Sequence, residues 1–229
     1  MAEIARPNCT HVIFDNDGLL LDTERIYTDI TQKICQEYGK TFDISLKQRI
    51  MGNSKHVSTK VVINEMQLPI TVDEFLSKAG ALNLTLFPTA KLLPGVEKLV
   101  RHLHKHNIPI AVATGSATRE FDLKITHHKE LFNLFHHTVK SDDPAVKHGK
   151  PNPDIFQVAA SRFTPPPASP DQVLVFEDAP NGVQAGKAAG MNVVMVPEAY
   201  VSRTLCSAAD QVLNSLEEFN PADWGLPSY

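Results

Sequence analysis

Short runs of apolar, mostly β-branched residues recur along the chain, with polar helix-forming stretches between them. Clear runs occupy 11–14, 108–114, 173–176 and 193–196, and weaker ones lie at 137–140 and 211–213. The clear runs are continuous rather than alternating, which is typical of strands covered on both faces in a parallel sheet. We therefore predict buried strands at these positions.

Helical segments of crossover length are expected between these strands, at 95–106, 117–127, 154–162 and 181–189. Pro94 before Gly95 marks a helix start, and Gly190 after two alanines marks a helix end. Strands that alternate with such helices predict an α/β fold with a doubly wound, mainly parallel sheet.

The stretch from 22 to 90 breaks this alternation, because it contains no convincing strand. Amphipathic helical segments are expected there instead, at 24–38, 44–51, 54–66 and 72–86. So long a helical block exceeds a crossover connection. We therefore predict an all-helical cap domain, residues 21–90, inserted into an α/β core domain made of residues 1–20 and 91–229, with linkers near 20–23 and 87–93.

Composition and charge are those of an ordinary globular protein. The 229 residues are 42% hydrophobic and 21% charged, with a formal net charge of −4. Binding to a nucleic acid polymer or an anionic membrane relies on concentrated positive charge, and no Lys/Arg run here reaches five residues. The charge does not exclude a small anionic substrate, since a pocket for one needs only one or two lysines.

The three cysteines, Cys9, Cys35 and Cys206, are too far apart for a zinc or redox pair, so we expect buried thiols. The ten histidines lack accompanying carboxylates in a ligand pattern, and packing roles are expected for them. Residues 1–7 contain no apolar signal-peptide core. We expect a cytoplasmic protein, monomeric by default.

Polar residues follow each predicted strand where the strand ends. Because ligands of doubly wound sheets bind outside the carboxyl ends of the strands, we expect these residues to converge. The set comprises Asp15, Asn16, Asp17, Gly18, Thr114, Gly115, Ser116, Lys150, Glu177 and Asp178.

The chemistry of this set is coherent. Carboxylates crowded at one point repel unless a hard divalent ion such as Mg²⁺ lies among them. Lys150 and Thr114 offer donors for phosphoryl oxygens, and phosphoryl transfer needs mainly positioning and charge neutralisation. Alternatives stay open: Thr114 also suits a helix N-cap, Lys140 and Lys147 rival Lys150, and Glu177 suits either a metal site or a structural role.

Four ordered segments resemble the motifs of the haloacid dehalogenase-like phosphatases: Phe-Asp-Asn-Asp-Gly at 14–18, Ala-Thr-Gly-Ser at 113–116, Gly-Lys-Pro at 149–151 and Phe-Glu-Asp at 176–178. The resemblance implies that Asp15 attacks phosphorus to form an aspartyl-phosphate. Asp17 would protonate the leaving oxygen and then activate the hydrolytic water.

The same resemblance implies a Mg²⁺ site and a phosphate site. Asp15 and Asp178 would bind Mg²⁺ through their side chains and Asp17 through its backbone carbonyl, with Glu177 helping through a water. Phosphate would be held by Thr114, Gly115, Ser116 and Lys150. Asp22 and Glu24 are also acidic, but hinge or helix-capping roles are favoured for them.

Other activities use similar scaffolds. Dehalogenases lack the acid two residues after the nucleophile, so Asp17 disfavours that reaction. Phosphosugar mutases of similar architecture carry a His twelve residues after the nucleophile, where this chain has Tyr27, and this favours hydrolysis. A signalling receiver domain is disfavoured because its acid pair and acceptor Asp lie on different strands.

A closer resemblance covers the segments 18–24, 142–144, 148–151, 176–182 and 225–229. These are similar to a subgroup that includes animal pseudouridine 5′-phosphatases and plant and fungal glycerol-3-phosphatases. The resemblance implies a small phosphomonoester substrate, with pseudouridine 5′-phosphate first and glycerol 3-phosphate or a sugar phosphate as the alternative. We expect the cap, around 24–31 and 49–54, to decide between them.

Overall fold

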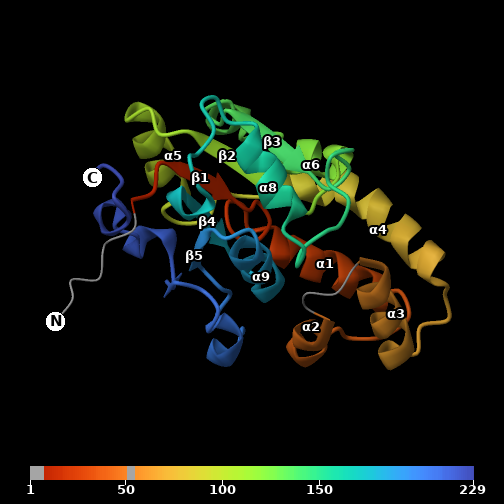
Figure 1. Cartoon of the computed structure of the whole chain (residues 1–229). Coiled ribbons are helices and arrows are strands. Elements are labelled where there is room, and N and C mark those ends of the chain that lie inside the picture. Colours follow the sequence, from red (N-terminus) through yellow and green to blue (C-terminus); the bar gives the residue numbers. More distant parts are fainter. Residues whose placement is uncertain (1–7, 51–54) are drawn as a thin grey trace.

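The apolar runs form one parallel sheet (Figure 1). In the computed structural model, which describes residues 8–50 and 55–229, six strands have the order β3-β2-β1-β4-β5-β6. All neighbouring strands pair in parallel. Their bounds are β1 (His11–Phe14), β2 (Ile110–Thr114), β3 (His137–Lys140), β4 (Val173–Glu177), β5 (Asn192–Met195) and β6 (Gln211–Val212). The predicted doubly wound parallel sheet is confirmed.

Two parts of the chain lie outside the described residues. The first is the N-terminal run 1–7. The second is 51–54, which includes the expected end of one cap helix, the expected start of the next, and most of the 49–54 segment. Among the described residues, no helix is both long and apolar enough to cross a membrane. The three cysteines are buried and free, as predicted.

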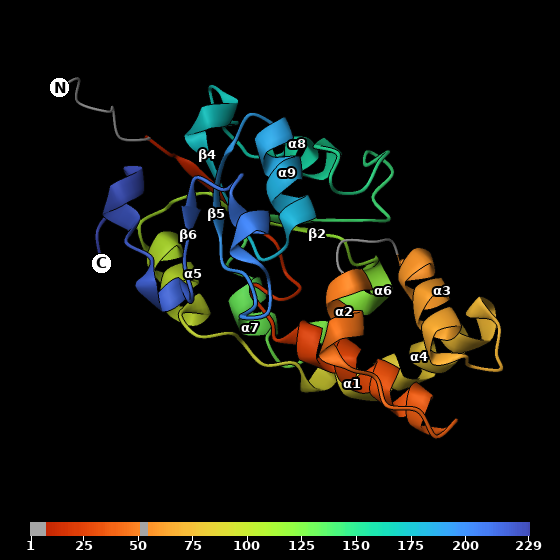
Figure 2. The same ribbon diagram turned by 90° about the horizontal axis from the view of Figure 1, so that it is seen from below.

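Alternate residues of each strand enter two separate apolar layers. Val12 and Phe14 of β1 belong to one layer, and Ile13 belongs to the other. Figure 2 shows α8 (Asp154–Ser161) and α9 (Pro180–Ala188) on one side of the strands. Helices α5 (Val96–Lys105) and α7 (Lys129–Phe132) lie on the other side. Both faces of the sheet are therefore covered, which explains why its central strands β1, β2 and β4 are buried throughout.

Two predicted elements have different bounds in the structure: one strand begins later than expected, and one helix is shorter. The strand expected from 108 begins at Ile110, directly after Pro109, because proline has no N–H to donate to a neighbouring strand. The helix expected over 117–127 is α6 (Thr118–Lys124), and α7 follows after a turn. At that turn the Thr126 hydroxyl donates to the Leu123 carbonyl over 2.7 Å, offering the backbone an alternative to further helix. Lys124 is therefore the last residue of α6.

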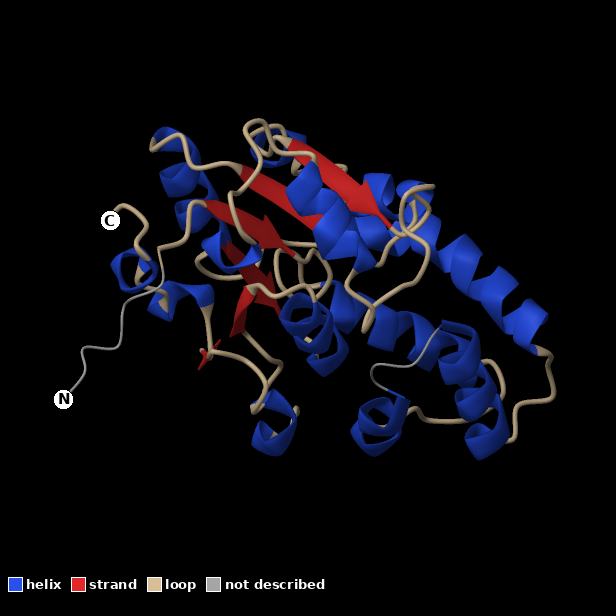
Figure 3. Ribbon diagram, in the orientation of Figure 1, coloured by secondary structure: helices blue, strands red, loops and turns tan. Residues whose placement is uncertain are grey.

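Five α-helices of the described chain lie between β1 and β2 in sequence, and the first four of them lie to one side of the sheet (Figure 3). These four are α1 (Thr23–Gln36), α2 (Ile44–Ile50), α3 (Lys55–Met66) and α4 (Val72–Leu86), and α4 is followed by a 3₁₀ helix, η1 (Phe87–Thr89). The apolar stripe of α1 is buried, as its spacing predicts. The two connecting segments are held together, since Lys91 N–H donates to Asp22 Oδ1 and Asp22 N–H donates to the Lys91 carbonyl.

Short 3₁₀ helices complete the described chain. They are η2 (Pro170–Gln172), η3 (Arg203–Cys206), η4 (Leu216–Glu218) and η5 (Pro221–Trp224).

Candidate active site

The site lies where the strand order reverses. Strand β1 has β2 on one side and β4 on the other. The chain leaves β1 toward β2 and leaves β4 toward β5, so these two connections diverge at the carboxyl ends of β1 and β4. A crevice forms at such a point in open α/β sheets, and ligands bind there. Asp15 directly follows β1, and Glu177 and Asp178 stand at the end of β4.

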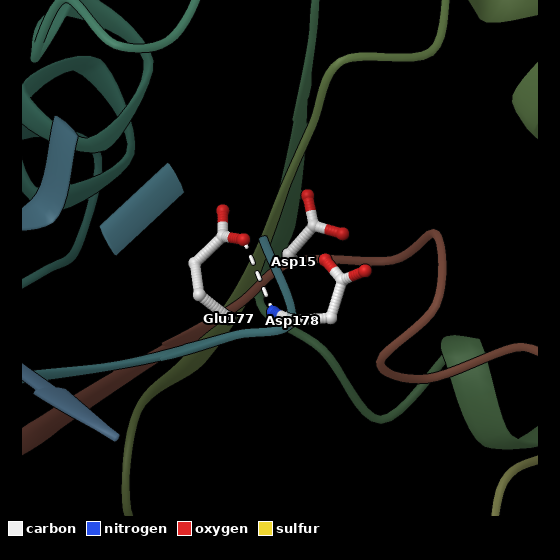
Figure 4. A group of neighbouring side chains, drawn as sticks. All are labelled: Asp15, Glu177 and Asp178. Atoms are coloured by element: carbon white, nitrogen blue, oxygen red, sulfur yellow. Dashed lines mark hydrogen bonds between the residues drawn. The ribbon is translucent and has the colours of Figure 1, made fainter. Parts of the chain in front are cut away.

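Three carboxylates converge at this edge. One oxygen each from Asp15, Glu177 and Asp178 lies within 4.8 Å of the others, and Figure 4 shows the three groups gathered at the strand ends. The approach depends on Gly18, whose φ is +81°, because a Cβ there would lie 2.4 Å from Asp178 Oδ2. The glycine of the first motif therefore makes room for the carboxylate of the last.

Lys150 joins this cluster from a distant loop. Its ammonium donates to Asp15 Oδ1 over 2.5 Å, to Glu177 Oε1 over 2.6 Å and to the Ala113 carbonyl over 3.1 Å. The two rival lysines lie elsewhere: Lys140 pairs with Asp122, and Lys147 donates to the Pro144 carbonyl. Among the candidates from the sequence, Lys150 is the one at the site.

Burial and like charge disfavour ionisation of these acids. Burial raises the pKa of Asp15 to about 7, with Lys150 opposing the rise and Glu177 adding to it. The pKa of Asp178 is raised well above its ordinary value, again mainly by burial and then by Glu177 and Asp15. The single ammonium of Lys150 therefore does not offset the burial and mutual repulsion of these carboxylates.

Asp17 has the opposite environment. Its Oδ1 accepts from Thr23 Oγ1 over 2.7 Å and from Lys124 Nζ over 2.5 Å. Its Oδ2 accepts from Thr114 Oγ1 over 3.1 Å and from Ser116 Oγ over 2.8 Å. Burial alone would raise the pKa of Asp17, but the Lys124 ammonium and these hydrogen bonds lower it to about 2. Asp17 is thus ionised in this arrangement, and it can donate a proton only after it has taken one up.

The open alternatives for Thr114 and Glu177 now have structural answers. Thr114 Oγ1 accepts from the Ser116 N–H over 3.0 Å, and the N-cap of α6 is Ala117. Thr114 is therefore not a helix cap. Glu177 is 1% exposed; besides its bond from Lys150, its Oε2 accepts from the Asp178 N–H over 3.2 Å, drawn as a dashed line in Figure 4. Glu177 therefore holds Lys150 and the Asp178 backbone in place, and one of its oxygens also belongs to the cluster formed with Asp15 and Asp178.

Two adjoining cavities open over these residues in the described part of the chain. One, of about 240 Å³, is lined by the carboxylates, Lys150, Gly115 and Ser116. The other, of about 340 Å³, lies among the helices α1 to α4. They share Glu24, Tyr27 and Gly115, so a ligand with its anionic end in the first can extend into the second.

Sequence analysis missed two residues that contact Asp17: Lys124 and Thr23. Lys124 lies three residues after the buried Phe121 in α6, and its side chain is 0% exposed. A lysine on the apolar face of a short helix was a usable signal, since lysine is almost never fully buried without a charged partner.

The donor set suits a divalent cation. Among the described residues, four carboxylates at this edge (Asp15, Asp17, Glu177 and Asp178) face two ammonium groups (Lys124 and Lys150). At full ionisation two negative charges stay uncompensated. Carboxylate oxygens are the ligands of hard ions such as Mg²⁺, and a cation here would offset the burial and like charge that raise the pKa of Asp15.

A sequence profile of the haloacid dehalogenase-like hydrolases matches residues 12–196. The matched span contains every site residue described above.

Individual relatives cover the whole chain. It is 50% identical to (DL)-glycerol-3-phosphatase 1, mitochondrial, of Arabidopsis thaliana, over 100% of this chain and 78% of that protein. It is 45% identical to a Drosophila melanogaster protein named "Probable pseudouridine-5'-phosphatase", over 100% of this chain and 99% of that protein. A haloacid dehalogenase-like protein of unknown function from Agrobacterium tumefaciens has a similar structure, with a TM-score of 0.77, 26% identity and coverage of 92% and 96%.

Proposed function

Because the chain belongs to the haloacid dehalogenase-like hydrolases, we propose that it is a Mg²⁺-dependent phosphomonoesterase with Asp15 as its nucleophile. One observation carries this proposal: Asp15 accepts a hydrogen bond from the Lys150 ammonium, lies beside the carboxylates of Glu177 and Asp178, and lines a cavity. Such a site can bind a phosphate and offer it an oxygen nucleophile.

The reaction proceeds in two steps. In the first, Asp17 has taken up a proton from solvent; a carboxylate oxygen of Asp15 forms a bond to phosphorus, the bond from phosphorus to the leaving oxygen breaks, and Asp17 gives its proton to that oxygen. In the second, water attacks phosphorus, the bond to Asp15 breaks, and Asp17 takes the proton from the water. Lys150, Thr114, Gly115 and Ser116 would hold the phosphoryl oxygens, and the Thr114 and Ser116 hydroxyls would have to turn from Asp17 Oδ2 to donate to them.

Mg²⁺ is assigned to the acidic cluster. Asp15 and Asp178 would hold it through side chains, Asp17 through its backbone carbonyl, and Glu177 through a water. The bound ion supplies positive charge to the phosphoryl oxygens and favours the ionised form of Asp15.

Residues 21–90 are proposed to act as a cap. The larger cavity lies among their helices and adjoins the carboxylates, so closure would keep bulk water away from the transferring phosphoryl group. Side chains of α1 to α4 that line the larger cavity would also surround the leaving group of the substrate.

The substrate is proposed to be a small phosphorylated metabolite, with pseudouridine 5′-phosphate first. The Drosophila relative supports this, as do apolar side chains of the larger cavity such as Phe42, Val62 and Phe75, which suit a flat base. Glycerol 3-phosphate is the second candidate, supported by the Arabidopsis relative. A phosphosugar mutase is disfavoured by Tyr27. Cytoplasmic location and a monomeric state stay predictions.

A phosphatase screen tests this function. Pseudouridine 5′-phosphate, glycerol 3-phosphate and hexose phosphates are compared by kcat/KM with Mg²⁺, and again after addition of EDTA. We expect turnover that EDTA abolishes and Mg²⁺ restores, with pseudouridine 5′-phosphate preferred. Turnover indifferent to EDTA would reject the metal site, and a preference for glycerol 3-phosphate would select the second candidate.

A further inference from the structure

Lys124 is a completely buried lysine that the reaction above does not use. Its side chain is 0% exposed, and its ammonium donates to Asp17 Oδ1 over 2.5 Å, Tyr27 Oη over 2.7 Å and Ser116 Oγ over 2.7 Å. Burying an ammonium is costly unless it is paired and hydrogen-bonded, and these partners match its three N–H groups. The chain thus maintains a buried cation whose charged partner is Asp17.

Two aromatic rings beside Lys124 come from α1 and from η1, the first and last helices of the segment between β1 and α5. Its ammonium lies 4.8 Å from the ring centroid of Tyr27 in α1 and 4.6 Å from that of Phe87 in η1. The two rings meet edge to face with centroids 5.4 Å apart. Lys124 itself belongs to α6, so it lies where the outgoing and returning segments meet the α/β core.

Helix α1 also contacts Asp17 directly. Thr23 and Tyr27 are one helical turn apart and therefore lie on one face. The Thr23 hydroxyl donates to Asp17 Oδ1, and the Tyr27 hydroxyl accepts from the lysine that donates to the same oxygen. If α1 moved away from the core, Asp17 would lose one donor and Lys124 one acceptor.

We propose that Lys124 is a positioning residue for the reaction: it holds the Asp17 carboxylate in place and, through Tyr27, makes that placement depend on the seating of α1. The inference rests on the phosphatase function proposed above. With Lys124 and Thr23 on one oxygen and Thr114 and Ser116 on the other, the carboxylate is held at both ends. Without the ammonium, the Asp17 side chain can rotate more freely. The distance from its carboxylate to the leaving oxygen of the substrate would then vary.

The test compares two esters that differ in their need for a proton. An alkyl ester such as glycerol 3-phosphate releases a poor leaving group that must be protonated, whereas p-nitrophenyl phosphate releases an aryl oxygen that departs without a proton. We expect Lys124→Met to lower kcat/KM on the order of 10²-fold for the alkyl ester. The loss for the aryl ester should be at least about tenfold smaller. The ratio of kcat/KM for the alkyl ester to kcat/KM for the aryl ester should therefore fall, and Asp17→Asn should lower this ratio as well.

Tyr27→Phe keeps the buried ring and removes only the hydroxyl, so it should give the same change in ratio at smaller size, even if Lys124→Met does not fold. Lys129→Met removes an exposed lysine just beyond α6 and should leave the ratio unchanged. In an Asp17→Asn background, Lys124→Met should shift the ratio no further.

A folded Lys124→Met or Tyr27→Phe enzyme that loses both activities equally would overturn the positioning role, while wild-type turnover leaves the phosphatase function standing. If the wild type hydrolyses neither ester with Mg²⁺, the proposed function itself fails.

Discussion

Lys150 Nζ lies 2.5 Å from Asp15 Oδ1, although 135 residues separate them in the chain. The ammonium also contacts Glu177 and the Ala113 carbonyl, so it is held between β1, β2 and β4. This contact shows which lysine lies beside Asp15, the proposed nucleophile.

Replacing Lys150 should impair catalysis strongly. Lys150→Met removes the cation beside Asp15 and the donor to the phosphoryl oxygens, and we expect kcat/KM to fall on the order of 10²–10³-fold. Steady-state assays with the best substrate measure this. Lys147→Met is the matched control, since that exposed lysine donates to the Pro144 carbonyl and should be dispensable. Equal losses in both variants would contradict the assignment.

Asp15→Asn should abolish turnover without unfolding the protein. The amide is nearly the same size but is a poor nucleophile, so kcat should fall on the order of 10³-fold or more. Because burial raises the pKa of Asp15, a neutral side chain there should leave Tm in EDTA unchanged or higher. Asp73→Asn, at an exposed position in α4, should behave like wild type. Near-normal activity of Asp15→Asn would remove Asp15 from the mechanism.

The stabilising effect of Mg²⁺ should depend on pH. The pKa of Asp15 is about 7 in the folded metal-free protein and 3.8 as an ordinary group, so between these values the native state binds more protons than the unfolded state. Stability without metal therefore falls as pH rises through this window. Mg²⁺ replaces those protons, so the rise in Tm on adding it should be larger at pH 8 than at pH 5.

Thermal unfolding with Mg²⁺ or EDTA at both pH values measures this difference. Asp15→Asn should reduce it, because the titrating carboxyl is gone. A Mg²⁺-induced rise in Tm that is the same at both pH values would argue against a metal among these carboxylates.

Gly182 should tolerate no side chain. A Cβ there would lie 2.0 Å from the Cδ of Glu177, which is 1% exposed and bonded to Lys150. Gly182→Ala must displace Glu177 or α9, and we expect about 1–3 kcal/mol of lost stability in urea unfolding together with lost activity. Gly80→Ala in α4 meets no described atom within 4 Å and should keep stability or gain up to about 1 kcal/mol. A stable, active Gly182→Ala enzyme would show that Glu177 need not be held in place.

Local sequence was sufficient for the elements and for the residues at the strand ends. Buried strands need continuous apolar runs, and amphipathic helices need helical spacing, so β1 to β6 and α1 could be predicted. The predicted end of the helix at α6 was wrong, because Thr126 donates to the carbonyl of Leu123 and a turn replaces the last expected helical residues. Asp15, Asp17, Glu177 and Asp178 were found because parallel strands bring their carboxyl ends to one edge.

Contacts between distant segments were decided by the tertiary structure. Which of Lys140, Lys147 and Lys150 reaches Asp15 depends on the path of a loop, and a loop path has no periodic pattern in the sequence. The bond between Lys124 and Asp17 requires α6 to pack beside the loop that follows β1. The sequence determined which charges gather at the edge of the sheet, because strand direction does so. Only packing decided which lysine neutralises which aspartate, because such a contact depends on side chains that are neighbours in space and not in the chain.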